Sequence, residues 1–149
     1  MIELEYNLLK NEIILLFNGI NDITLATSVD NKTYARTIAQ TNTGLTMYFS
    51  TSGNSNKVKQ ISKNSNVALA VKNIQIEGIA ENIGHPSKHV EYMRNCMKKY
   101  SIEGDTFPAE ASDVVIKISP TKITLFKSLD KAYFDILDIK NKKAYRIEA

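Results

Sequence analysis

"ITLATSVDNKTYARTIAQTNTGLTMYFS" spans residues 23–50 and alternates apolar with polar side chains. The alternation runs through residues 23–29, 33–40 and 45–50, and two polar turns, DNK and TNTG, interrupt it. A period of two, broken by turn residues, is typical of β-strands joined by hairpins. The stretch therefore predicts three strands in an antiparallel meander.

Helical patterns surround these strands. Residues 4–18 carry an apolar stripe at helical spacing and end at Asn18-Gly19, a typical helix stop. NKVKQISKNS (56–65) indicates a short helix. Pro86 occupies the first helical position of PSKHVEYMRNCMKKY (86–100), as proline often does. We therefore expect helices packed on the outside of the sheet.

The rest of the chain is also predicted to form short strands, apart from residues 101–112, which have no periodicity and predict the longest loop. Many short strands, few helices and no regular alternation of strand with helix favour a mainly β fold, an antiparallel barrel with flanking helices. The chain shows no repeat or linker, so we expect a single domain over residues 1–149. The further expected strands cover residues 67–72, 74–83, 113–119, 122–128, 132–139 and 143–148.

Composition is that of an ordinary globular domain, with 43% hydrophobic and 23% charged residues. The formal net charge of +3 is too small to indicate a nucleic-acid partner. The longest apolar run, residues 13–17, is too short for a membrane span, and the acidic start of the chain is unlike a secretory signal. Cys96 is the single cysteine, which excludes an intrachain disulfide and favours a cytoplasmic location.

Nucleotide and metal motifs are missing from the sequence. The six glycines lie singly, so neither a dinucleotide-binding G-x-G-x-x-G nor a P-loop can be formed. His85 and His89 are spaced like two metal ligands, but Pro86 puts a helix start between them. No acidic or cysteine cluster completes a ligand set, so we expect no metal site.

Cys96 is the single candidate for a thiol nucleophile. Arg94 and Lys98 lie nearby in sequence and could lower the pKa of its thiol, but no histidine is adjacent. A partly buried helix cysteine is the better interpretation, and we assign no catalytic residue.

The stretch FSTSGNSNKVKQI (49–61) concentrates small polar side chains and a lysine at the expected junction of a strand and a helix. Free N–H groups at a helix start, together with the helix dipole, attract anions. Thr51 and Ser55 add hydroxyl groups, and Lys57 adds a positive charge. A simple helix cap by Ser55 is the alternative. The residues alone leave both interpretations open.

Arg36 shares one face of its expected strand with Tyr34, Ile38 and Gln40. An unpaired charge on a half-buried strand is costly. Either Arg36 faces solvent, or an anion or a planar ring accompanies it.

Four pieces of sequence occur in a characteristic order: Arg36-Thr37-Ile38, Phe49-Ser50-Thr51, Ser55-Asn56-Lys57-Val58 and QISKNSNVALAV (60–71). In order and spacing they resemble the FMN-binding split barrel of the pyridoxamine 5′-phosphate oxidase superfamily. The resemblance covers roughly residues 20–85 and is greatest to the small stress-protein and flavin-reductase-like branch.

The resemblance implies a homodimer with FMN at the subunit interface. It places Arg36, Thr37 and Ile38 along the isoalloxazine ring. It places Ser50 and Thr51 at the ribityl-phosphate part, and Ser55 and Lys57 at the phosphate. Asn73 takes the position of a family glutamine that reaches the flavin, and Asn56 replaces a second basic residue. The chain has no tryptophan, unlike the C-terminal segment that grips flavin and substrate in true oxidases, so pyridoxamine phosphate oxidation is not expected.

Several functions are compatible with these residues. The first is an FMN-dependent oxidoreductase with a nicotinamide electron donor and an unknown small-molecule substrate. The second is a non-enzymatic module for flavin storage or stress. Related barrels also bind haem or a deazaflavin, and the lack of a convincing axial histidine weighs against haem. Single-stranded nucleic acid binding through Tyr34, Tyr48 and Phe49 is disfavoured by the modest charge.

Overall fold

The computed structural model of the chain describes residues 1–104 and 106–149. In chain order the elements are β1 (Ile2–Glu3), α1 (Tyr6–Asn18), β2 (Asp22–Val29), β3 (Lys32–Ala39), β4 (Thr41–Thr43), β5 (Thr46–Ser52), α2 (Asn56–Lys63), β6 (Asn66–Val71), β7 (Ile74–Gly84), the 3-10 helix η1 (Pro86–Lys88), α3 (Val90–Lys99), β8 (Asp113–Ser128), β9 (Ala132–Asp138) and β10 (Lys143–Glu148). Most of the described residues in regular structure belong to β-strands, of which β8 is 16 residues long, and the helices α1, α2 and α3 have 13, 8 and 10 residues.

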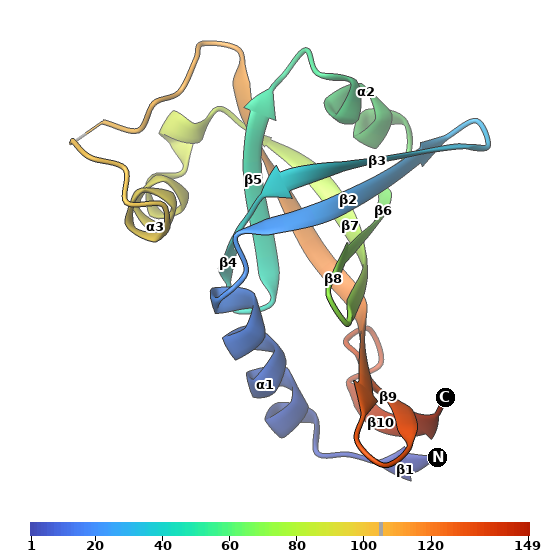
Figure 1. Cartoon of the computed structure of the whole chain (residues 1–149). Coiled ribbons are helices and arrows are strands. Elements are labelled where there is room, and N and C mark those ends of the chain that lie inside the picture. Colours follow the sequence, from blue (N-terminus) through green and yellow to red (C-terminus); the bar gives the residue numbers. More distant parts are fainter. Residues whose placement is uncertain (105) are drawn as a thin grey trace.

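The strands form one antiparallel sheet that curls into a split barrel (Figure 1). Neighbouring strands follow the order β1-β10-β9-β8-β7-β6-β2-β3, and β5 pairs with β4 and β8. Gln40 alone separates the edge strand β3 from β4, and β4 pairs with β5, so the sheet curls round without closing between β3 and β5. The predicted fold class, mainly β with flanking helices in an antiparallel split barrel, is confirmed.

The predicted three-strand meander is wrong in one pairing. β2 and β3 form the expected hairpin, with Asp30 and Asn31 at positive φ in its turn. β5, however, pairs with β8, where Met47 lies opposite Ile118. Local alternation shows that a segment is a strand but not which distant strand it joins.

β8 is a single long strand where the sequence predicts two. Its first half pairs with β5 and its second half with β9, while β7 runs along its other side. Pro120 lies opposite Gly78, where the ladder with β7 shifts register. Proline lacks the N–H of a regular ladder and is found at such bulges. The proline between the two predicted strands thus marks the place where β8 changes neighbours.

The helix predicted from Pro86 begins later than expected. Residues 86–88 form the separate turn η1, and α3 starts at Val90. His85 anchors this region, because its Nδ1 accepts from the N–H of Ser87 at 3.1 Å and its Nε2 lies 2.9 Å from the carbonyl of Glu110. In the predicted loop, residues 101–104 and 106–112 contain no helix or strand, and Asp105 lies outside the described residues.

Apolar side chains from α1 and the inner faces of the strands fill the core. Ile13 and Phe17 of α1 and Phe49 of β5 are among the fully buried residues. α1 packs against β4, β9 and β10, whereas α2 packs on β2 and β7. Figure 1 shows α1 and α2 at opposite ends of the barrel. The two ends of the chain meet where β1 pairs with β10.

Candidate functional site

The segment between β5 and α2 is held close to the start of β8. The N–H of Gly53 donates to the carbonyl of Ser112 at 2.7 Å, and a Cβ atom at position 53 would lie 2.7 Å from that same oxygen. Only a residue without a side chain fits such an approach. Gly53 therefore fixes where Ser55 and the start of α2 lie relative to the barrel.

Ser55 occupies the cap position of α2 in an extended conformation, but its hydroxyl makes no capping hydrogen bond. The hydroxyl oxygen is buried and has no hydrogen-bond partner among the described residues. Leaving a buried polar group unpaired costs about 1–3 kcal/mol. The free N–H groups of the first helical turn are available to a bound anion, and the Ser55 hydroxyl beside them is not engaged by another described residue.

Two cations lie beside this helix start. Burial lowers the pKa of Lys57, and the nearby charge of Arg36 lowers it further. Burial also lowers the pKa of Arg36. Within residues 1–104 and 106–149, neither side chain forms an ion pair with a carboxylate. Two half-buried cations that repel each other favour the binding of an anion.

Neutral acceptors fix the direction of Arg36. Its Nη1 donates to Thr27 Oγ1 at 2.9 Å and to the carbonyl of Leu25 at 3.2 Å, and its Nη2 donates to Gln60 Oε1 at 2.7 Å. Thr27 donates to the same Gln60 oxygen at 2.6 Å. These bonds orient the guanidinium between β2 and α2 without cancelling its charge.

Thr37 and Ile38, the other two residues expected along the isoalloxazine ring, lie on opposite faces of β3. Thr37 is exposed on the outer face of β3, opposite Thr24 of β2. Ile38 is a core residue with 6% of its surface exposed. Only the main chain of Ile38 could therefore contact a ligand, whereas Thr37 offers its side chain on the face opposite Arg36.

Ser50 and Thr51 are neighbours in β5 and therefore point to opposite faces. Ser50 lies against Tyr92 of α3: burial raises the pKa of Tyr92, and the Ser50 hydroxyl counteracts part of that rise. Thr51 follows the core residue Phe49 on the other face, at the strand end that leads to Ser55. The structure thus brings Thr51 toward the helix start and Ser50 toward α3.

Asn73 is not brought to this site. It lies in the turn between β6 and β7, and its Nδ2 donates to the carbonyl of Phe126 at 2.8 Å. Thr27 pairs with Val67 at the beginning of β6, so Asn73 lies beyond the other end of that strand.

Sequence reasoning missed Gln60 and Thr27. Gln60 is one of several polar residues on a short amphipathic helix, so nothing local distinguishes it. Thr27 is only 2% exposed, but threonine is common in strands and its burial depends on α2 packing over β2. The sequence does indicate that a half-buried Arg36 needs hydrogen-bond acceptors, but it does not show which residues supply them.

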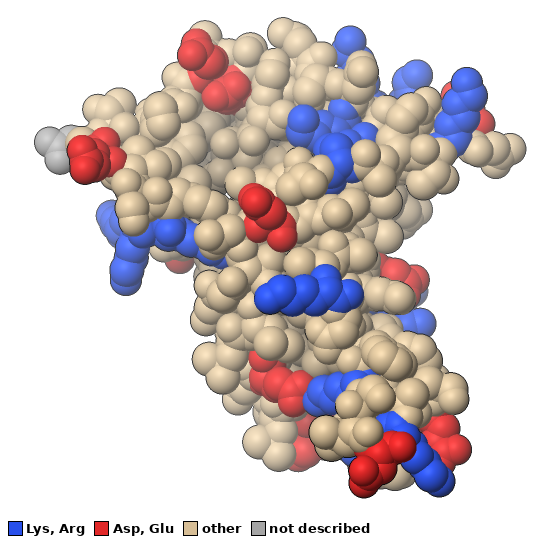
Figure 2. Space-filling view, viewed as in Figure 1, with Lys and Arg blue, Asp and Glu red and all other residues tan. Residues whose placement is uncertain are grey.

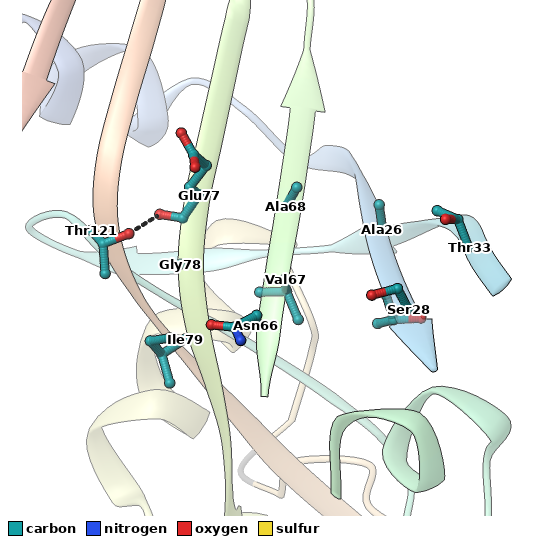
Figure 3. A pocket seen from close by; sticks show the side chains of 11 residues that line it. Ala26, Ser28, Thr33, Asn66, Val67, Ala68, Glu77, Gly78, Ile79 and Thr121 are labelled. Carbon is teal, nitrogen blue, oxygen red and sulfur yellow. Dashed lines mark hydrogen bonds between the residues drawn. The ribbon is translucent and has the colours of Figure 1, made fainter. Parts of the chain in front are cut away.

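In the part of the chain that the structure describes, no helix covers one outer face of the sheet. Across four strands, Ala35, Ala26, Ala68 and Glu77 lie side by side in register. An open depression of about 420 Å³ lies on this face. Figure 3 shows the side chains that line it and the hydrogen bond from the hydroxyl of Thr121 to the carbonyl of Glu77, which is 3.1 Å long. Small side chains make the face flat.

The remaining candidate groups serve the fold in this structure. His89 Nε2 lies 2.7 Å from the carbonyl of Ile83, and His85 accepts a hydrogen bond from the N–H of Ser87 in the same turn.

Burial raises the pKa of the Cys96 thiol, although the hydrogen bond from Tyr92 and the charge of Lys99 act in the opposite direction. Phe49 lies in the core, whereas Tyr34 is exposed, so these two aromatic residues do not share one surface. Over residues 1–104 and 106–149, no cluster of three His, Cys, Asp or Glu side chains suited to a metal is found.

In the part of the chain that the structure describes, none of the helices is both long enough and apolar enough to cross a membrane.

The fold and this arrangement agree with a comparison to protein families. The family model described as pyridoxamine 5′-phosphate oxidase matches residues 9–127. The chain belongs to the pyridoxamine 5′-phosphate oxidase family. The match runs from within α1 to near the end of β8, so it includes the loop before α2 and the whole Arg36 network. The predicted resemblance is confirmed.

Solved structures share the fold. General stress protein 26 of Bacillus anthracis has a TM-score of 0.64 at 20% identity, over 95% of this chain and 98% of that chain. ChuZ of Campylobacter jejuni has a TM-score of 0.72 at 16% identity, and the match covers 95% of this chain and 63% of ChuZ. A pyridoxamine 5′-phosphate oxidase-related, FMN-binding protein of Nostoc punctiforme has a TM-score of 0.59 at 12% identity. The match covers 95% of this chain and 92% of that protein. At such identities the likeness shows the fold. No curated protein matches the chain.

Proposed function

We propose that this chain binds a phosphorylated flavin, FMN, with the phosphate at the start of α2. The observation that carries the proposal is the buried, unpartnered hydroxyl of Ser55 beside the cations Lys57 and Arg36. A phosphate ester offers several strong acceptor oxygens and negative charge, which suit a hydroxyl, free main-chain N–H groups and two cations. The FMN-binding fold neighbour from Nostoc punctiforme supports the same ligand.

In this proposal the isoalloxazine ring lies along β3. That strand ends the sheet order, so its outer N–H and C=O groups are free to bond the edge of a planar heterocycle. Within Arg36-Thr37-Ile38, alternate residues would supply these main-chain groups, because successive residues of a strand point their N–H and C=O groups to opposite edges. Thr51 would contact the ribityl-phosphate part, and Ser50 would do so only from the α3 side of β5. Asn73 is omitted, because its side chain is bonded to Phe126.

The proposed activity is that of a flavin-dependent oxidoreductase in the cytoplasm, with a nicotinamide donor and a small-molecule substrate. Bound flavin supplies the electron or hydride transfer in such enzymes. The chain's own residues supply binding and charge: Lys57 and Ser55 hold the phosphate, and Arg36 provides a fixed positive charge near the ligand. A module that only stores flavin would need the same residues.

We also propose a homodimer that covers the outer face of β3, β2, β6 and β7. Thr37 lies on this face, so a second copy would stand beside the strand edge assigned to the ring. The row of small side chains formed by Ala35, Ala26 and Ala68 allows close packing of a second sheet. Ala68→Arg should convert a dimer to a monomer in light scattering, whereas Ala111→Arg, in an exposed loop, should leave the mass unchanged. A monomeric wild type would contradict this assembly.

Ligand titration tests the proposed function. Purified protein is titrated with FMN and with riboflavin, and binding is followed by flavin fluorescence. FMN should bind at least about tenfold more tightly than riboflavin, because the phosphate adds contacts worth 1.4 kcal/mol or more. Failure to bind either compound would rule out the proposal. Oxidation of NADH by the FMN-loaded protein, compared with free FMN and offered a panel of acceptors, then separates an oxidoreductase from a storage module.

A further inference from the structure

A second group of cations continues from the proposed phosphate site along α2. Figure 2 shows Lys and Arg side chains gathered over α2 and the hairpin between β2 and β3. Beneath them lies an open pocket of about 260 Å³. Its lining residues are Val29, Asp30, Lys32, Tyr34, Lys59, Gln60 and Lys63.

Gln60 joins this pocket to the proposed phosphate site. It lines the pocket, and its Oε1 accepts the hydrogen bond from Arg36 at 2.7 Å. The N–H of Lys59 donates to the carbonyl of Ser55 at 3.2 Å, so Lys59 lies one helical turn beyond Ser55. One turn advances about 5.4 Å along the axis, a separation that two linked phosphate groups can span with long lysine side chains.

The charges of the pocket are unbalanced. Lys32, Lys59 and Lys63 face it together with a single acid, Asp30. In the described ranges, 1–104 and 106–149, none of these three lysines forms an ion pair. Lys59 and Lys63 are four residues apart and therefore lie on one side of α2. A polyanion lying along α2 would reduce their mutual repulsion.

We infer that this pocket is a second anion subsite, which takes the second phosphate of a flavin dinucleotide, FAD. Lys59 and Lys63 contact that phosphate, and Tyr34, which is 40% exposed, offers its ring to the adenine. This inference rests on the proposed function, because the flavin-proximal phosphate must lie at Ser55 for the second phosphate to reach Lys59.

The inference is tested by FAD and FMN affinities of the wild type and of Lys59→Ala/Lys63→Ala, measured by fluorescence titration. The wild type should bind FAD at least as tightly as FMN. The double variant should weaken FAD roughly tenfold, since two exposed charge contacts contribute up to about 1 kcal/mol each. FMN should change less than about threefold. Lys98→Ala, an exposed lysine of α3, serves as the control and should change neither affinity.

Two results would overturn the subsite while leaving FMN binding intact. One is an unchanged FAD affinity in the double variant. The other is an equal loss for FAD and FMN, which would indicate general attraction of anions rather than contact with the second phosphate. Tyr34→Leu provides an independent check, since it should weaken FAD roughly fivefold and leave FMN unchanged. If the wild type binds neither flavin, the proposed function fails as well, which is a distinct outcome.

Discussion

Gln60 Oε1 lies 2.7 Å from Arg36 Nη2, so a residue of α2 fixes the direction of an arginine on β3. The same oxygen accepts a hydrogen bond from Thr27 of β2 at 2.6 Å. Residues of β2 and α2 thus fix the guanidinium of Arg36, which lies on β3. Such preorganisation reduces the side-chain entropy that binding would otherwise cost.

Substitutions at Gln60 separate orientation from charge. Gln60→Leu removes the acceptor and should weaken FMN binding roughly three- to tenfold, because Arg36 must be ordered on binding. Gln60→Glu keeps an acceptor but adds a negative charge beside the phosphate, so it should weaken FMN more than Gln60→Leu. Fluorescence titration gives both affinities. Wild-type affinity in Gln60→Glu would show that the phosphate does not lie near Arg36.

Ser55 should matter for ligand binding but not for stability. Its hydroxyl makes no hydrogen bond to the described residues, so Ser55→Ala should not lower the free energy of unfolding, in contrast to the loss of about 1 kcal/mol that is usual for a capping serine. FMN affinity should nevertheless fall several-fold. Ser62→Ala on the same helix, whose hydroxyl bonds the carbonyl of Lys59, should leave FMN affinity unchanged. A stability loss in Ser55→Ala as large as that of an ordinary cap would contradict the structure.

Gly53 should not tolerate a side chain. A methyl group there would meet the carbonyl oxygen of Ser112 at 2.7 Å, so Gly53→Ala must displace the loop from β8. We expect a loss of roughly 1–3 kcal/mol in the free energy of unfolding and weaker FMN binding. Gly19→Ala is the control, because its nearest non-neighbour atom would lie 3.7 Å away at a permitted φ of −93°. Equal behaviour of the two variants in urea unfolding would be inconsistent with this packing.

Asp135 makes the stability of the protein dependent on pH. It is 1% exposed and accepts hydrogen bonds from Arg146 at 2.7 and 3.0 Å and from Lys127 at 3.0 Å. Burial by itself would raise the pKa of Asp135, but the hydrogen bonds and charges of Arg146 and Lys127 outweigh burial and lower it. A carboxyl with a lowered folded pKa stabilises the protein fully above its unfolded pKa of about 4, and this contribution is lost as pH falls through the folded pKa.

Asp135→Asn should therefore be most destabilising at neutral pH. We expect a loss of about 2 kcal/mol at pH 7, because the substitution removes the charge-assisted hydrogen bonds of Asp135 to Arg146 and Lys127, whose side chains are partly exposed. The difference from wild type should shrink below about pH 4, where the wild-type carboxyl also becomes protonated. Urea unfolding at pH 7 and at pH 3 measures both values, with the exposed Asp130→Asn as the control. A difference that does not change with pH would show that the charge of Asp135 is unimportant.

Strand positions could be predicted where burial alternates strictly. In β7, Ile74, Ile76, Gly78 and Ala80 are buried and the residues between them are exposed, which is the pattern that the sequence shows. The pairing of β5 with β8 could not be predicted in this way. It depends on how the barrel closes, a non-local property that no window of sequence contains.

Part of the candidate site could also be predicted. Arg36 and Lys57 are charged residues in unusual surroundings, and the structure brings them close together. Gln60 and Thr27 have no local signal, because they matter only through the packing of α2 on β2. The unpartnered state of the Ser55 hydroxyl was likewise not predictable, since serine at a helix start ordinarily caps it.

The central claim is that Lys57 helps to bind the phosphate of FMN, and Lys57→Ala tests it most directly. Affinities for FMN and riboflavin are measured by fluorescence titration in the wild type and the variant. The account predicts a loss of about 1.5–3 kcal/mol for FMN, roughly tenfold or more, with riboflavin affinity unchanged. An unchanged FMN affinity, or an equal loss for both compounds, would contradict it.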